Sequence, residues 1–263
     1  PFTPDGVTTR FQRRFWECFI NAGGVSVFDQ ARGVIAEAMD PLQDPPERFY
    51  HDVAKSEDQV LALMAILKVV QGRKRRPLVL LSDRGRGKSA ALGLAAGEHL
   101  RDRGGRILLV APSRAAVSPV FEHARSVWLQ AAWKNDTLSD EHGRLELAVP
   151  SQLVDNLPDA DCVFVDEAAA LPIPLLRRLL DRYARLVFST TVHGYEGTGR
   201  GFAIRFRGYL DERTPAWREL TMQTPIRWAP GCPVEAGVFA GLALDSAPRP
   251  TSLMKETTDE PIT

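Results

Sequence analysis

The sequence of 263 residues has few cysteines, no long apolar run and no excess of either charge. Its three cysteines, Cys18, Cys162 and Cys232, are too far apart for a metal-binding spacing or a disulfide framework, which favours the reducing cytoplasm. No stretch approaches the length of a membrane-spanning helix and no signal-peptide pattern is visible, so we expect no membrane partner. The 33 basic residues match the 33 acidic ones, so any contact with nucleic acid would be local.

The remaining composition, 44% hydrophobic and 25% charged, is that of an ordinary globular protein long enough to bury a sizeable core. Because the chain begins with Pro1 rather than Met, we expect a fragment or a processed segment. The breaker-rich stretch DPLQDPP at residues 40–46 predicts a linker. We therefore expect three parts, which are the end of an N-terminal region with a linker (1–55), a main domain (56–235) and a tail (236–263).

The main domain is organised around residues 78–94, which read LVLLSDRGRGKSAALGL. An apolar, strand-like run is followed by a loop rich in Gly and Arg, and then by a helical pattern. Backbone N–H groups of such a loop face phosphate oxygens, and the helix N-terminus adds a partial positive charge. Lys88 would reach the β- and γ-phosphates of a nucleotide, and the Ser89 hydroxyl would bind Mg²⁺.

The phosphate-loop motif G-x-x-x-x-G-K-[ST] is incomplete here because Ser82 stands at its first position. The glycines nearest the phosphates, Gly85 and Gly87, are present. The alternative is a tight glycine turn with a solvated Lys88. The strand before the loop and the helix after it favour the nucleotide site, because the motif requires that context.

A second informative stretch, DCVFVDE at residues 161–167, places Asp166 and Glu167 at the end of a buried strand. Ligands of open α/β sheets bind at the carboxyl ends of the strands. Asp166 would hold Mg²⁺ through water, as the acidic partner of Ser89, and Glu167 would orient the attacking water or accept its proton. The alternative is an acidic first turn of a helix, but the phosphate loop upstream favours the site.

Gln59 has two interpretations, both of which stay open. Residues 56–70 predict a helix that Ser56 caps, and Gln59 three residues later completes a capping box. A glutamine at the start of the helix before a phosphate loop can instead bind the edge of adenine, as in helicase-type ATPases.

Four glycines lie in HGYEGTGRG at residues 193–201, directly after an expected strand at 186–191. This composition predicts a flexible loop that closely approaches a ligand. A guanidinium from Arg200 would stabilise charge on the transferred phosphoryl group. The alternative is a surface turn with a solvated arginine, and the position of the loop after a parallel strand favours the nucleotide contact.

Alternating apolar runs and helical patterns predict an α/β fold with a mostly parallel sheet and helices on both faces. Further expected strands are residues 106–112 and 145–149, with one more within 217–228. The expected helices are residues 172–183, residues 202–210 and one that Ser113 caps and that runs to about Trp133, before a polar loop at 135–143.

A basic run, GRKRR at residues 72–76, precedes the first strand of the domain. Such a run can bind nucleic acid. It can equally form a solvated loop that protects the strand from aggregation, and that second interpretation is favoured.

These pieces resemble one family in their order along the chain. The segments SDRGRGKSAALGLAAG, VDEAAALPIPLL, STTVHGYEGTGRGF and TPIRWAPGCPVE, with TTRFQRRF near the start, resemble the ATPase (helicase-like) module of the tRNA(Met) cytidine acetyltransferases. The resemblance covers roughly residues 8–235, and residues 194–201 carry its most specific motif. It implies a RecA-like P-loop NTPase domain that uses ATP and Mg²⁺, and a tRNA partner in the full-length protein. It also implies ATP hydrolysis coupled to transfer of acetyl from acetyl-CoA to N4 of the wobble cytidine.

The resemblance also implies roles for single residues. Gln59 matches the glutamine on the adenine side, Asp166 and Glu167 match the Asp-Glu pair, and Arg200 matches an arginine that contacts the nucleotide. The family tolerates a small residue other than Gly at Ser82. The expected nucleotide-binding residues of the loop are Arg84, Gly85, Arg86, Gly87, Lys88, Ser89 and Ala90. The expected catalytic residues are Lys88, Asp166, Glu167 and Arg200, with Ser89 and Asp166 as the Mg²⁺ ligands.

The acetyltransferase module that should follow residues 225–235 is missing, and no acetyl-CoA loop of the form [QR]-x-x-G-x-[GA] is found. The nearest match begins at Arg84 and fails because Ser89 stands at its last position. We therefore expect the ATPase portion of a longer enzyme, with a tail leading toward the absent module. A fragment of a translocating RNA helicase and a non-hydrolysing, nucleotide-gated RNA-binding module are the alternatives. The sequence gives no indication of the oligomeric state.

Overall fold

The structure, a computed structural model, describes residues 9–21, 24–29, 33–36, 54–192, 198–242 and 244. The chain forms two compact units, one made of residues 43–230 and the other of residues 1–42 together with 231–263. The expected linker at residues 40–46 lies outside the described residues. Among the described residues, no helix has both the length and the apolar character needed to span a membrane.

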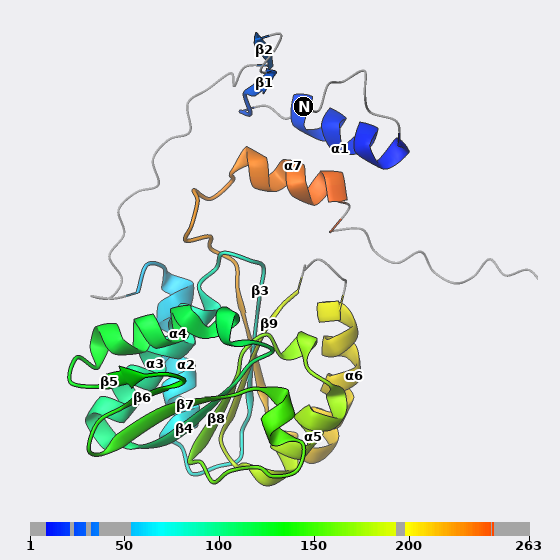
Figure 1. Cartoon of the computed structure of the whole chain (residues 1–263). Helices are drawn as coiled ribbons and strands as arrows, with labels where there is room; N and C mark the ends of the chain where they lie inside the picture. Colours follow the sequence, from blue (N-terminus) through cyan, green and yellow to red (C-terminus); the bar gives the residue numbers. More distant parts are fainter. Residues whose placement is uncertain are drawn as a thin grey trace, which may run out of the picture. The chain divides into compact units, whose positions relative to one another are not determined.

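The larger unit is built on an eight-stranded sheet (Figure 1). In spatial order its strands are β10 (Arg218–Met222), β3 (Leu78–Ser82), β9 (Leu186–Thr191), β8 (Cys162–Val165), β4 (Gly105–Val110), β7 (Gly143–Ala148), β6 (Thr137–Ser139) and β5 (Ala132–Lys134). The first six strands pair in parallel, and the β5–β6 and β6–β7 pairs are antiparallel. The predicted mostly parallel sheet is therefore confirmed.

Helices cover both faces of this sheet (Figure 1). On one face lie α2 (Glu57–Val70), α3 (Lys88–Arg103) and α4 (Arg114–Val127), and on the other lie α5 (Ile173–Arg182) and α6 (Thr198–Arg213). Short 3₁₀ helices, η2 (Pro150–Leu153) and η3 (Ala168–Ala170), follow β7 and β8. This arrangement is the RecA-like P-loop NTPase fold that the sequence predicts.

Strand β3 shows why the central strands have continuous apolar sequences. Leu78 and Leu80 belong to the core under α2, α3 and α4, whereas Val79 and Leu81 belong to the core under α5 and α6. Since successive side chains of a strand point to opposite faces, a strand covered on both sides must be apolar at every position. The phosphate loop therefore leaves a strand that is fixed from both faces.

The helix predicted to run from Ser113 to about Trp133 ends earlier than predicted. Helix α4 ends at Val127, and Trp133 lies in β5, which pairs with β6 in the stretch predicted to be a polar loop. The hairpin turns at Asn135, whose φ of 54° is left-handed, as a tight two-residue turn requires. The Trp133 ring stacks on Phe121 of α4 at a centroid distance of 5.3 Å, so tertiary packing stabilises the hairpin.

The smaller unit is made of residues from both the N-terminal and the C-terminal part of the chain. It contains α1 (Arg10–Ile20), the antiparallel pair β1 (Val27–Asp29) and β2 (Gly33–Ala36), and α7 (Pro233–Leu242). Arg14 donates to the Gly241 carbonyl over 2.9 Å, and a Cβ on Gly241 would lie 2.6 Å from the Phe15 ring. Helix α7 extends beyond residue 235, where the expected tail begins, because it packs against α1.

Candidate active site

The phosphate loop joins β3 to α3 with two left-handed glycines. Gly85 has a φ of 80° and Gly87 a φ of 88°, values that favour glycine because it lacks Cβ. Gly87 is also the N-cap of α3, and no described side chain caps this helix. The first N–H groups of α3 therefore have the orientation and the partial positive charge that suit a phosphate.

Lys88 is buried and held by two hydroxyls. Its Nζ donates to Ser82 Oγ over 3.0 Å and to Thr191 Oγ1 over 3.1 Å. Burial lowers the pKa of Lys88, while the nearby carboxylates of Glu167 and Asp166 oppose that shift. Ser82 replaces the usual first glycine of the motif without disturbing the loop, because its hydroxyl accepts from Lys88 and donates to the Asp83 carbonyl over 2.7 Å.

Ser89 and Asp166, the predicted Mg²⁺ ligands, are in direct contact. Ser89 Oγ donates to Asp166 Oδ2 over 2.9 Å, and Ser189 of β9 donates to Oδ1. Burial raises the pKa of Asp166, and the two hydroxyl contacts oppose that rise. A hydroxyl and a carboxylate are hard oxygen ligands of the kind that Mg²⁺ prefers. The residues therefore fit the ion, which would bind between Ser89 and Asp166.

Glu167 has a left-handed backbone, with φ 49° and ψ 50°. This conformation costs a non-glycine residue about 1–2 kcal/mol, and such strain concentrates at functional sites. Thr191 Oγ1 lies 3.1 Å from both carboxylate oxygens of Glu167 and also accepts from Lys88. Since a hydroxyl has one proton and two lone pairs, Thr191 can accept from Lys88 while it donates to Glu167.

Gln59 has contacts both at the start of α2 and at the phosphate loop. Its backbone N–H donates to the capping Ser56 hydroxyl over 3.2 Å, but its side-chain oxygen accepts from Lys55 rather than completing a capping box. The side-chain nitrogen donates to the Gly87 carbonyl over 3.4 Å. The Gln59 side chain therefore lies against the phosphate loop, and its contact with adenine stays a prediction.

Residues 223–228, which we call the strap, run from the end of β10 over the phosphate loop. At one end, the Asp58 carboxylate accepts from the N–H groups of Gln223 and Thr224 over 2.8 and 2.7 Å. In the middle, the Ile226 N–H donates to the Gly85 carbonyl over 2.9 Å. The strap thus connects the start of α2 to the phosphate loop.

The end of the strap packs directly on the loop. A Cβ placed on Gly85 would lie 2.6 Å from the ring of Trp228. The guanidinium carbon of Arg86, a residue that is only 7% exposed, lies 5.8 Å from the centre of the same ring. A cation over an aromatic ring at this distance is attracted to it, so Trp228 orders two neighbouring residues of the phosphate loop.

Comparison with known proteins identifies the family. A profile described as RNA cytidine acetyltransferase NAT10/TcmA, helicase domain, matches residues 79–245. The chain belongs to the RNA cytidine acetyltransferase family.

Relatives named tRNA(Met) cytidine acetyltransferase TmcA resemble the chain over much of its length. The relative from Nitrosococcus halophilus is 42% identical over 267 residues, covering 100% of this chain and 36% of that protein. The one from Vibrio cholerae is 47% identical over 178 residues, covering 68% of this chain and 25% of that protein. The chain thus spans roughly a third or less of the length of these relatives.

A solved structure gives a more distant likeness. The large terminase from a thermophilic bacteriophage, in complex with ATP-gamma-S, aligns with a TM-score of 0.46 at 15% identity. The alignment covers 64% of this chain and 44% of the terminase chain.

Within this helicase domain of the RNA cytidine acetyltransferase family, the predicted end of the loop around Arg200 is wrong. Helix α6 begins at Thr198, so Arg200 and Gly201 lie in its first turn, and residues 193–197 lie outside the described residues. The glycine-rich composition does not predict the start of a helix here, because Gly has low helix propensity. The nucleotide contact of Arg200 stays a prediction.

The other predicted residues lie along one edge of the sheet. Lys88, Ser89, Asp166 and Glu167 are connected by hydrogen bonds, with Gln59 at the loop beside them. In the loop, Arg84 is exposed and its carbonyl accepts from Arg86, and Ala90 is buried in the first turn of α3.

The hydroxyls of Ser82, Ser189 and Thr191, and the residues Asp58 and Trp228, are not among the predicted site residues. Ser82 ends β3, and Ser189 and Thr191 lie at the polar end of β9, LVFSTT; hydroxyls at the carboxyl end of a buried strand face the ligand edge. No local pattern marks Asp58 or Trp228, because both act through residues distant in sequence.

Proposed function

We propose that this chain binds and hydrolyses ATP as the ATPase module of an enzyme that acetylates N4 of the wobble cytidine of elongator tRNA(Met). Transfer of acetyl from acetyl-CoA belongs to a part of the protein outside this chain. The observation that carries the proposal is the hydrogen-bonded chain from Lys88 through Thr191 to Glu167, beside the Ser89–Asp166 contact. The names of the relatives support the RNA target.

The reaction is an in-line attack of water on the γ-phosphorus of ATP. The N–H groups at the start of α3 and the Lys88 ammonium bind the phosphates and stabilise the charge that develops there. Glu167 orients the attacking water and takes its proton, while the bond between the γ-phosphorus and the oxygen of the leaving ADP breaks. Ser89 and Asp166 would hold Mg²⁺, which would neutralise part of the phosphate charge.

The arrival of ATP changes the partners of Lys88. Its ammonium is held by hydroxyls in a buried place where desolvation disfavours the charge. The triphosphate would add negative charge to that of the nearby Glu167 and Asp166 carboxylates and so favour the charged ammonium of Lys88. The Thr191 hydroxyl contacts the Glu167 carboxylate, and the backbone of Glu167 is in the left-handed conformation. Together these two features fix the position of Glu167.

Phosphate release by the 263-residue chain tests the proposal, with and without tRNA. Lys88→Ala is expected to lose ATP binding, and Glu167→Gln to keep binding but to lose at least about 100-fold in rate. Lys68→Ala, a change at an exposed lysine of α2, is the matched control. Equal rates in all variants would contradict the assignment, and ATP binding without any phosphate release would favour the nucleotide-gated RNA-binding module.

A further inference from the structure

A group of cations lies at the edge of the sheet opposite the phosphate loop. Parallel strands all begin at one edge, and the nucleotide site is at the other, where β3 ends. Arg76, Arg185 and Arg218 stand at or just before the starts of β3, β9 and β10, which are neighbours in the sheet. In the strand register Leu78 is opposite both Arg218 and Val187, so the three arginines lie at similar levels across adjacent strands.

The basic run at residues 72–76, just before β3, forms hydrogen bonds with residues at this edge. Arg73, Lys74 and Arg75 are exposed. The Arg185 Nε donates to the Gly72 carbonyl over 2.7 Å, and the guanidinium of Arg75 donates to the Leu180 carbonyl. Carbonyl partners fix the position of a guanidinium without neutralising it, and each guanidinium has further N–H donors.

Arg103 at the end of α3 joins the same group. Burial lowers the pKa of His99, and the positive charges of Arg103 and Arg185 lower it further, while Asp161 and Asp102 oppose them. Helix α3 ends at Arg103, and β4 begins at Gly105, so Arg103 lies at the edge where the parallel strands begin. We call the seven residues the basic edge: Arg73, Lys74, Arg75, Arg76, Arg103, Arg185 and Arg218.

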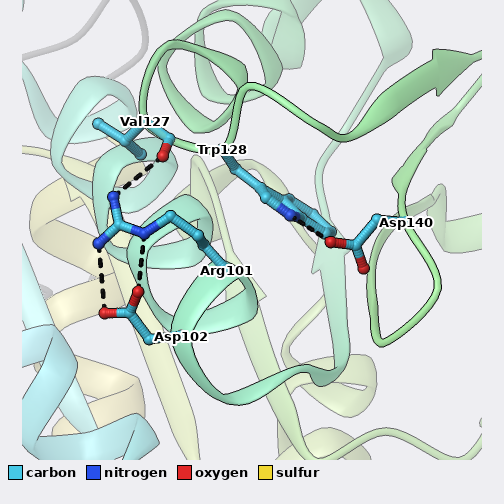
Figure 2. Close-up of polar contacts among 5 residues, drawn as sticks. All are labelled: Arg101, Asp102, Val127, Trp128 and Asp140. Carbon is cyan, nitrogen blue, oxygen red and sulfur yellow. Dashed lines mark hydrogen bonds and ion pairs between the residues drawn. The ribbon is translucent and has the colours of Figure 1, made fainter.

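Neighbouring arginines form ion pairs with carboxylates, but among the described residues no carboxylate pairs in this way with the basic edge. Arg101 pairs with Asp102 over 2.7 Å and also donates to the Val127 carbonyl (Figure 2). In the same way Arg106 and Arg144 share Glu146, and Arg182 pairs with Asp159.

Within the described part of the chain, no residue of the basic edge forms such an ion pair. Asp161 lies nearby, but its carboxylate accepts the Arg106 N–H over 2.8 Å. The chain as a whole has no net charge, so this local excess of positive charge comes from where the basic residues lie in the fold. Like charges that are held together repel one another, and a polyanion removes that repulsion.

We infer that the basic edge binds the phosphate backbone of RNA. Neighbouring strands lie about 4.8 Å apart, so the group spans more than one phosphate and suits a chain of them rather than a single anion. It consists of arginines and one lysine, side chains that commonly contact backbone phosphates, and such contacts do not depend on the base sequence. The identity of the RNA as tRNA rests on the proposed function. The RNA would then bind at the opposite edge of the sheet from ATP.

Binding of tRNA by the 263-residue chain at several salt concentrations tests the inference. The double variant Arg73→Ala/Lys74→Ala is expected to bind about tenfold more weakly near 0.1 M salt, and its salt slope is expected to fall by about 1.5. The matched double variant Arg125→Ala/Lys134→Ala removes one exposed arginine from α4 and one exposed lysine from β5, the strand farthest from β10 in the sheet. It is expected to leave affinity and slope unchanged within about twofold.

Two outcomes would overturn the inference. One is an equal loss of tRNA affinity in the two double variants, and the other is no tRNA binding by the wild-type chain. Phosphate release without RNA, measured on the same proteins, separates this result from the proposed function. A chain that binds tRNA with the expected salt slope but releases no phosphate supports the basic edge and refutes the ATPase. Thermal unfolding of each variant checks that the chain is still folded.

Discussion

The ring of Trp228 occupies the space into which any side chain at Gly85 would project. The two residues are far apart in sequence, and the Ile226 N–H bonded to the Gly85 carbonyl brings them together. The phosphate loop is therefore shaped by its own glycines and also by the strap. A substitution at Gly85 must meet both the left-handed φ and the Trp228 ring.

Gly85→Ala is expected to destabilise the loop by about 1–2 kcal/mol and to weaken ATP binding at least tenfold, because alanine is strained at φ 80°. Equilibrium ATP binding and urea unfolding measure the two effects. Gly208→Ala is the control, since a Cβ at that position in α6 meets no atom within 4 Å. An added Trp228→Ala change should restore part of the loss if the ring contributes to it. Wild-type ATP affinity in Gly85→Ala would refute the role of this contact.

Thr191→Val is expected to slow ATP hydrolysis about 10- to 100-fold with little change in the KM for ATP. The change keeps the shape of the side chain but removes the hydroxyl that contacts both Lys88 and Glu167. Thr191→Ser retains the hydroxyl and should keep most of the rate. Steady-state kinetics of the two variants make the comparison, and an equally slow Thr191→Ser would assign the loss to packing instead.

Asp58→Ala is expected to lower the free energy of unfolding at pH 7 by roughly 1 kcal/mol, after allowance for the partial exposure of Asp58. Although burial opposes the shift, hydrogen bonds from Thr224 and Gln223 lower the pKa of this carboxyl from 3.8. The stabilisation is therefore fully present above pH 3.8 and is lost as pH falls through the lowered pKa of the folded state. Urea unfolding at several pH values should show the difference from wild type shrinking in acid.

Glu57→Ala is the control for that experiment, because it removes a carboxylate from the same first turn of α2. It should reproduce only the part of the effect that comes from the helix dipole. If Glu57→Ala and Asp58→Ala lose the same stability, the bonds to the strap contribute nothing.

Cys162 is expected to resist alkylation in the folded protein. It is fully buried in β8, where desolvation raises the pKa of its thiol, and reaction requires the thiolate. Cys18 and Cys232 are half-buried and should be modified first by iodoacetamide near pH 8. Mass spectrometry after timed labelling measures the three rates, which should converge in urea. Rapid labelling of Cys162 without denaturant would contradict the packing of β8 between β9 and β4.

Signals that lie within a few residues of one another were readable in the sequence. The run from β3 through Gly85 and Gly87 to Lys88 is one such signal, and the apolar strand that ends at Asp166 is another. Each combines a buried strand with the polar group that follows it, so the fold class and the position of the loop followed directly.

Features that depend on distant contacts were not readable. The end of α4 and the β5–β6 hairpin are decided by the stacking of Trp133 on Phe121, which overrides the helical pattern. The strap depends on Asp58 and Gly85, both distant from it in sequence. Helix α6 starts within a glycine-rich stretch because its apolar residues, including Phe206, join the core beneath it.

The pairing of α1 with α7 makes the larger unit an insertion within the smaller one. Residues 43–230 form a loop closed by contacts such as that between Arg14 and Gly241. Closing a long flexible loop is entropically unfavourable, and the cost grows slowly with the length of the loop. The contacts between α1 and α7 must therefore offset that cost whenever residues 43–230 are unfolded. Deleting α7 would leave the aromatic face of α1, with Phe15 and Phe19, without its cover.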